Sequence, residues 1–180
     1  MEVATLTWNV IGIAVLALAA VTARSVALAG FGLDSLIEIG ASTVVLWELA
    51  GTGEKRQRQA LRMIAFAFVA LALYLIVQTA AVLVGGFHPH HSAAGIVWTA
   101  LTAFVMFGLA EAKRRTGSAL GNPVLITEGR VTFIDGLLAV AVLVGLVLNA
   151  ALGAWWADPA SGLVIVFYAA KEARGILGRR

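Results

Sequence analysis

The sequence predicts an all-α bundle of six transmembrane helices, and three observations support this fold class. Of its 180 residues, 61% are hydrophobic and only 13% are charged, whereas a soluble domain is nearer half apolar and a quarter charged. Six segments are each long enough to cross a hydrocarbon core of about 30 Å as a helix. The basic residues gather between those segments. We therefore expect a single transmembrane domain over 1–180, without a soluble C-terminal domain.

The expected helices follow one another through short connections. We place them near 5–23, 25–50, 61–86, 94–112, 124–149 and 159–176. The stretches GTGEKRQRQ and KRRTGSALGNP interrupt the apolar runs, so both are expected to be loops. Asp158 and Pro159 predict the start of the last helix, with the carboxylate as its N-cap and proline at the first helical position.

Charge distribution predicts the orientation in the membrane. Three basic clusters fall on one side of a six-helix arrangement: Lys55, Arg56, Arg58 and Arg62; Lys113, Arg114 and Arg115; and Lys171, Arg174, Arg179 and Arg180. Cytoplasmic loops of membrane proteins carry an excess of basic residues. We therefore expect a multi-pass cell-membrane protein with this side and both termini in the cytoplasm. The net charge of +3 is thus explained by topology, so the expected partner is the lipid bilayer and not nucleic acid.

Two acidic residues lie well inside the second apolar segment, which reads SVALAGFGLDSLIEIGAS. Asp34 and Glu38 are four residues apart, so they share one face of a helix. A carboxylate at the bilayer centre costs about 2.5–3.5 kcal/mol on insertion scales, and two like charges repel each other. A bound divalent cation offsets both costs.

The fifth segment carries a second acidic face. Glu128 and Asp135 are seven residues apart, with Thr132 between them on the same face. If the second and fifth helices pack together, Asp34, Glu38 and Asp135 converge at mid-membrane depth. Oxygen ligands of this kind suit a divalent metal. The less certain members of this candidate metal site are Glu128, Ser35 and Thr132.

With these acids in place, the chain resembles the cation diffusion facilitators, a family of proton-coupled exporters of zinc and related divalent metals. The resemblance is carried by SVALAGFGLDSLIEIGAS, EGRVTFIDGLLA and WWADPASGLVI. Asp34 and Glu38 match the two acids that the family places on its second helix, and Asp135 matches the aspartate on its fifth. The residue that corresponds to the family's histidine is Val131, and Glu38 stands where aspartate is commoner.

The resemblance implies a divalent-cation efflux transporter that works by proton-coupled antiport and alternating access. Loss of an imidazole at Val131 removes a ligand that favours zinc, so zinc, manganese, iron(II) and cobalt all stay open as the transported metal. No cofactor and no catalytic residue are expected. Because members of the family are typically dimeric, a homodimer through membrane helices is a further expectation.

Several alternatives stay open. The chain could be a membrane-embedded metal-dependent enzyme, a passive pore, or a structural or regulatory subunit with a degenerate transport site. The buried acids could be protonated and purely structural. Glu128 could pair with Arg130 or with the basic stretch instead of binding metal. The loop histidines His88, His90 and His91 could capture metal or simply form a polar turn.

Overall fold

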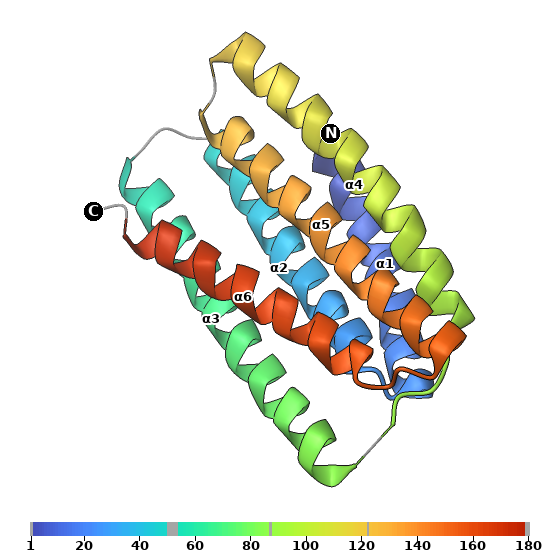
Figure 1. The fold of residues 1–180 in the computed structure, drawn as a ribbon. Helices are drawn as coiled ribbons and strands as arrows, with labels where there is room; N and C mark the ends of the chain where they lie inside the picture. The colour runs from blue at the N-terminus through green and yellow to red at the C-terminus, as the bar shows by residue number, and fades with distance from the viewer. Residues whose placement is uncertain (1, 50–53, 87, 122, 179–180) are drawn as a thin grey trace.

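The computed structural model describes residues 2–49, 54–86, 88–121 and 123–178. In this part the chain forms helices and no strand, which confirms the predicted all-α bundle (Figure 1). The helices are α1 (Glu2–Ala23), α2 (Val26–Leu49), α3 (Glu54–Gly85), α4 (Ala93–Leu120), α5 (Pro123–Leu152) and α6 (Ala157–Leu177).

Both stretches expected as loops are largely helical. α3 begins at Glu54 and so contains Lys55, Arg56 and Arg58, while α4 continues through Lys113 and ends at Leu120. Lysine, arginine, glutamate and glutamine are good helix formers, so a loss of hydropathy did not mark the end of a helix. α4 stops at Gly121, whose left-handed φ of 61° and backbone bonds to the carbonyls of Gly117 and Ser118 close the last turn.

The helices pack as a ring of four with a pair beside it. α1 packs on α2, α2 on α5, α5 on α4, and α4 on α1, while α3 lies along α6 (Figure 1). The α3–α6 pair contacts the ring through α2 and α5. α2 and α5 therefore lie at the seam between the ring and the pair, and they carry most of the buried acids.

Two glycines on α5 permit close helix contact. A Cβ atom on Gly129 would lie 3.2 Å from the carbonyl oxygen of Ala110 and 3.3 Å from Cβ of Lys113, both on α4. A Cβ atom on Gly145 would lie 2.8 Å from the carbonyl oxygen of Ala157 at the start of α6. The absence of a side chain favours this close approach of the helices, and the first contact brings α4 against the acidic face of α5.

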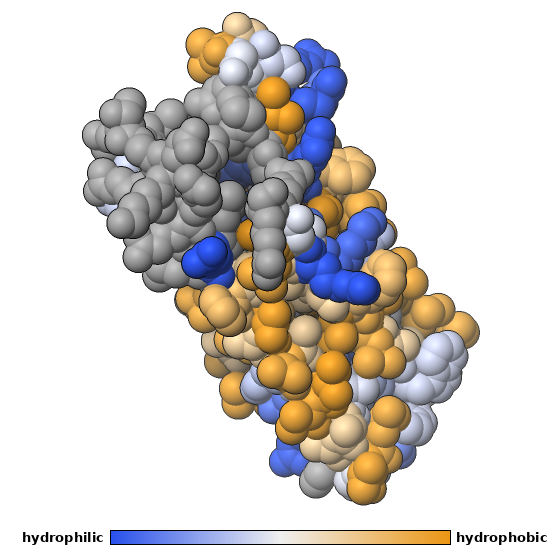
Figure 2. All heavy atoms as spheres, turned by 90° about the vertical axis from the view of Figure 1, so that its left-hand side faces the viewer, coloured by the Kyte–Doolittle hydropathy of each residue, from blue (hydrophilic) through white to orange (hydrophobic). Residues whose placement is uncertain are grey.

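The outer surface is strongly apolar. Large side chains that soluble proteins bury are exposed here, including Val84 at 89%, Phe104 at 82% and Val21 at 78%. Figure 2 shows an extended hydrophobic surface on one face of the bundle. Among the described residues, four helices are long and apolar enough to cross a membrane: Val3–Ala23, Phe68–Gly85, Ala93–Leu120 and Glu128–Leu152. An apolar surface of this extent is suited to contact with lipid, so the chain is a multi-pass membrane protein.

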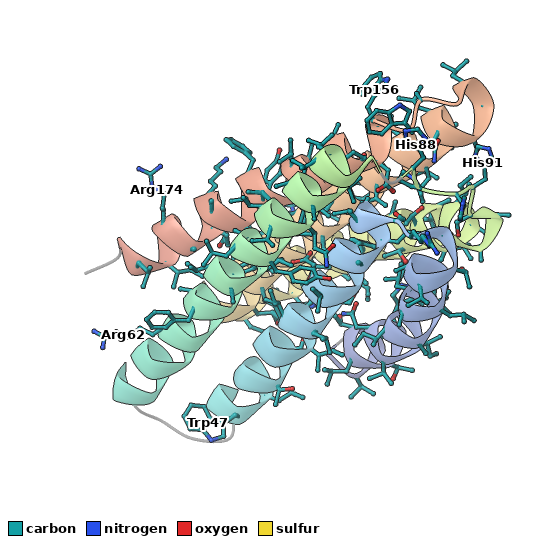
Figure 3. All side chains as sticks on the ribbon, turned by 90° about the horizontal axis from the view of Figure 1, so that it is seen from below. Trp47, Arg62, His88, His91, Trp156 and Arg174 are labelled. Atoms are coloured by element: carbon teal, nitrogen blue, oxygen red, sulfur yellow. The ribbon has the colours of Figure 1, made fainter. Side chains whose placement is uncertain are left out.

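The two ends of the bundle differ in chemistry. Arg62 and Arg174 lie near one end with Trp47, whereas His88, His91 and Trp156 lie at the opposite end (Figure 3). Trp47 of α2, Arg62 of α3 and Arg174 of α6 thus lie on the same side, which agrees with the predicted placement of the first and last basic clusters. At the histidine end, α1 and α2 are joined through Arg24, whose φ of 52° turns the chain sharply.

Asp158 caps α2 and not its own helix, contrary to the expectation from the Asp-Pro pair. α6 begins at Ala157, and its N-cap, Trp156, makes no side-chain capping bond. The Asp158 carboxylate instead accepts hydrogen bonds from the backbone N–H groups of Val26 (3.0 Å) and Ala27 (3.3 Å) and from the Ser25 hydroxyl. The first amides of α2 would otherwise be unsatisfied, so the carboxylate serves the helix that it faces.

Candidate cation site

One small cavity collects three of the four acids that the sequence singled out. It has a volume of about 20 Å³, and Asp34 and Glu38 of α2 and Asp135 of α5 all line it. A cavity of this size holds about one water-sized particle. The remaining lining residues are Ile37, Phe68, Val131, Ile134, Leu138, Tyr168, Ala169 and Glu172. A larger apolar groove of about 660 Å³ between α1, α2 and α3 has no charged lining residue, so the smaller cavity is where ionic chemistry is concentrated.

Asp135 is a buried acid in this cavity that lacks hydrogen bonds. Its side chain is only 3% accessible, yet neither carboxylate oxygen has a hydrogen-bond partner. Asp34 and Glu38 lie close enough to interact with it electrostatically. A buried carboxylate without donors is costly unless a cation or proton reaches it. The sequence predicted that Asp135 lies near Asp34 and Glu38, and the structure adds that its oxygens lack hydrogen-bond partners.

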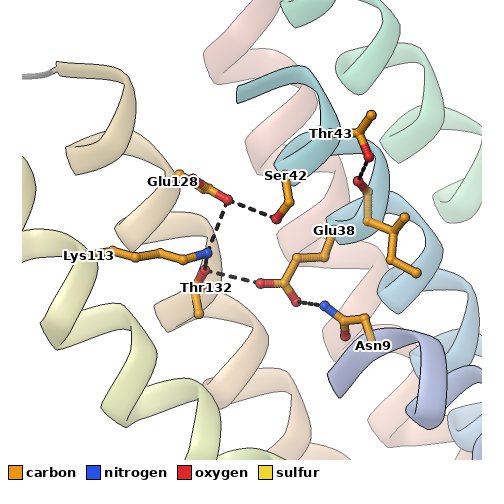
Figure 4. A network of polar contacts seen from close by, with 8 residues as sticks. Asn9, Glu38, Ser42, Thr43, Lys113, Glu128 and Thr132 are labelled. Atoms are coloured by element: carbon orange, nitrogen blue, oxygen red, sulfur yellow. Dashed lines mark hydrogen bonds and ion pairs between the residues drawn. The ribbon is translucent and has the colours of Figure 1, made fainter. Parts of the chain in front are cut away.

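Glu38 is held by hydrogen bonds on both of its oxygens (Figure 4). Asn9 of α1 donates from Nδ2 to Oε2 at 3.0 Å, and the Thr132 hydroxyl of α5 donates to Oε1 at 3.1 Å. Each carboxylate oxygen has a further lone pair. Glu38 is therefore fixed in position and still able to bind a cation.

Glu128 is paired with a buried lysine. Lys113 of α4 is completely buried, and its Nζ lies 3.0 Å from Glu128 Oε1 (Figure 4). The same oxygen accepts from the Ser42 hydroxyl at 2.9 Å, whereas Oε2 has no hydrogen-bond partner. Of the alternatives for Glu128, pairing with the basic stretch is the one observed, and the residue does not line the cavity.

The two hydroxyl candidates lie outside the cavity lining. Ser35 is buried, and its hydroxyl donates to the carbonyl oxygen of Phe31 within α2 at 3.2 Å. Thr132 is completely buried and lies between Lys113 and Glu38. Thr132 thus contacts the candidate site through a carboxylate, which makes it a supporting residue in this arrangement.

The sequence pattern did not identify Lys113, Glu172 or Asn9 as parts of the site. Lys113 was assigned to a loop, although it continues the spacing of the buried α4 residues Thr99, Thr102, Ala103, Met106, Ala110 and Gly117. That spacing of three and four residues is the signal that could have revealed it. Glu172 has no comparable signal, because its place on the cavity depends on how α6 packs.

The loop histidines do not come together as a metal centre. The His88 ring packs against Trp155 with centroids 4.7 Å apart, and the backbone N–H of His90 donates to the carbonyl oxygen of Ala23 at 2.7 Å. Across the described residues, no group of three or more His, Cys, Asp or Glu side chains has an arrangement ready to hold a metal ion. The cavity acids share a cavity without being gathered around one point.

Comparison with known proteins defines the class of this membrane bundle. Residues 62–178 match the cation efflux transmembrane domain, a match that covers more than half of the chain. The chain therefore belongs to the cation efflux family, a family of membrane cation transporters. No curated protein matches the chain. The matched range includes Lys113, Asp135 and Glu172, whereas Asp34 and Glu38 precede it.

Proposed function

We propose that this cation transporter carries divalent metal ions through the carboxylate-lined cavity between α2 and α5. The single observation that supports this most strongly is Asp135, a buried carboxylate without hydrogen-bond donors that faces the same cavity as Asp34 and Glu38. Hard divalent ions prefer oxygen ligands. Zinc also accepts carboxylates, so zinc, manganese, iron(II) and cobalt are the candidate substrates.

Binding requires a small rearrangement. The acids share a cavity of about 20 Å³ but are not arranged as a metal-binding group in this conformation. An incoming cation would draw them together, and repulsion between carboxylates would separate them again after release. Movement of the α3–α6 pair against the four-helix ring is the motion that would change the cavity, because its walls come from both parts.

Proton coupling follows from the same chemistry. Carboxylates bind metal when deprotonated, so protons that arrive on the far side compete for the same oxygens and release the cation. We assign the end with Arg62 and Arg174 to the cytoplasm on the basis of its positive charge. The expected direction is then efflux from the cytoplasm, in exchange for protons.

Glu172 gives the cavity a fourth acid, from α6. It is partly accessible, unlike the buried acids Asp34 and Asp135. It also lies in the C-terminal part of α6, toward the end that carries Arg174. We propose that Glu172 meets the cation first on the cytoplasmic side and passes it to the deeper carboxylates.

A flux assay in proteoliposomes tests this function. Purified protein would be reconstituted with an imposed pH gradient, and uptake of zinc, manganese, iron(II) and cobalt would be measured in competition. We expect saturable uptake that collapses with the gradient and is abolished in Asp34→Ala and Asp135→Ala. Metal flux that persists in both variants would reject the site. Unsaturable, gradient-independent flux would indicate a pore, and lipid conversion without flux would indicate an enzyme.

A further inference from the structure

The fully buried Lys113 is connected to the candidate cation site through one hydroxyl group. Its Nζ lies 3.0 Å from the Thr132 hydroxyl oxygen, and that hydroxyl lies 3.1 Å from Glu38 Oε1 (Figure 4). Lysine only donates hydrogen bonds and an ionised carboxylate only accepts them. The Thr132 hydroxyl must therefore accept a hydrogen bond from Lys113 and donate one to Glu38. The lysine thus sets the direction of this series of hydrogen bonds.

The same lysine compensates the charge of Glu128. The Lys113–Glu128 pair, with 3.0 Å between Nζ and Oε1, has side-chain exposures of 0% and 3%. Because the positive charge is committed to Glu128, it supports Glu38 through Thr132 without placing an ammonium group among the lining residues of the cavity. A lysine that lined the cavity would repel an incoming metal ion.

We propose that Lys113 is a positioning residue for cation binding: it orients Thr132, which fixes Glu38 in the geometry that receives the metal. This inference rests on the proposed transport function and adds a determinant of metal affinity on α4, a helix with no residue lining the cavity. Groups that hold metal ligands in place typically contribute about 10–100-fold to metal affinity. Lys113 and Thr132 act in series, so removal of either breaks the same connection.

The test compares Lys113→Met, Thr132→Val and the double variant in proteoliposomes, with the metal that the wild-type protein transports best, Zn²⁺ or Mn²⁺. Each single substitution should raise KM about tenfold or more, with a much smaller change in the maximal rate per reconstituted protein. Because one connection is broken in both cases, the double variant should resemble either single variant. Lys113→Arg and Thr132→Ser, which retain a cationic donor and a hydroxyl, should lie closer to wild type.

Two controls separate positioning from general damage. Arg115→Met removes a cation from the same helix at a side chain that is 76% exposed, and KM should not change. If Lys113→Met alone does not fold because Glu128 is left unpaired, Lys113→Met with Glu128→Gln removes both charges and should still raise KM. An unchanged KM in Thr132→Val, or multiplicative effects in the double variant, would overturn the inference. Wild-type protein without metal flux would instead reject the proposed function itself.

Discussion

The Thr132 hydroxyl on α5 donates a hydrogen bond to the Glu38 carboxylate on α2, across 3.1 Å. This bond joins the two helices that carry the deepest acids, and it is buried at both ends. Asn9 holds the other oxygen of Glu38 from α1. Glu38 is therefore the fixed member of the candidate site, whereas neither oxygen of Asp135 has a hydrogen-bond partner.

Asp135→Asn should stabilise the metal-free protein while removing its response to metal. The substitution removes a negative charge that is buried without hydrogen bonds, and a buried charge is more costly than a buried neutral amide. Thermal unfolding in detergent should show a higher Tm for the metal-free variant than for the metal-free wild type. Added zinc or manganese should raise the Tm of wild type, because a ligand that binds the folded state stabilises it, and should leave the variant unchanged. A lower metal-free Tm in the variant would contradict this account of Asp135.

Asp158→Ala should destabilise the bundle by loss of the cap on α2. Its carboxylate satisfies two backbone amides of α2 and the Ser25 hydroxyl at a completely buried position. Loss of an N-cap costs about 0.5–2 kcal/mol, which should appear as a lower Tm. The matched control is Glu111→Ala, which removes the ion pairs with Arg114 and Arg115 at an acid that is 40% exposed and should lower the Tm much less, because exposed ion pairs contribute little to stability. Equal effects of the two substitutions would argue against the capping role.

Val131→His should shift metal preference toward zinc. Val131 lines the cavity beside Asp135, so an imidazole at this position would add a nitrogen ligand to an oxygen-only site. Imidazole favours zinc over manganese, and we expect the ratio of zinc to manganese affinity to rise about tenfold or more. Val144→His, at a 50% exposed position on the same helix, should leave the ratio unchanged. An unchanged ratio of zinc to manganese affinity in Val131→His would indicate that the metal does not bind in this cavity.

Hydrophobic runs were sufficient to predict the helical membrane bundle and the six helices that the described residues form. They misplaced the limits of α3 and α4, because the basic residues Lys55, Arg56 and Lys113 lower hydropathy without breaking a helix. The four-residue spacing of Asp34 and Glu38 correctly predicted one shared face, and both residues line the same cavity as Asp135. Their role as metal ligands stays a prediction.

Other parts of the site depend on contacts between distant segments. Lys113 meets Glu128 because Gly129 lets α4 approach α5 closely, and no local pattern specifies that crossing. Asp158 follows the local rule for a helix start, but Ser25 and the open end of α2 lie beside it in space and receive its hydrogen bonds. Glu172 reaches the cavity only through the packing of α6. These contacts join segments that are far apart in the sequence, so they can be recognised only from the tertiary structure.

Equilibrium binding of Mn²⁺ and Zn²⁺ to the purified protein, measured by titration calorimetry in detergent, tests the central claim most directly. The account predicts one saturable site per chain in the wild type, loss of that site in both Asp34→Asn and Asp135→Asn, and its retention in Glu111→Gln. Proton release on binding should accompany the signal, because the ligands must be deprotonated. Full wild-type binding in both aspartate variants would contradict the claim that a divalent cation occupies this cavity.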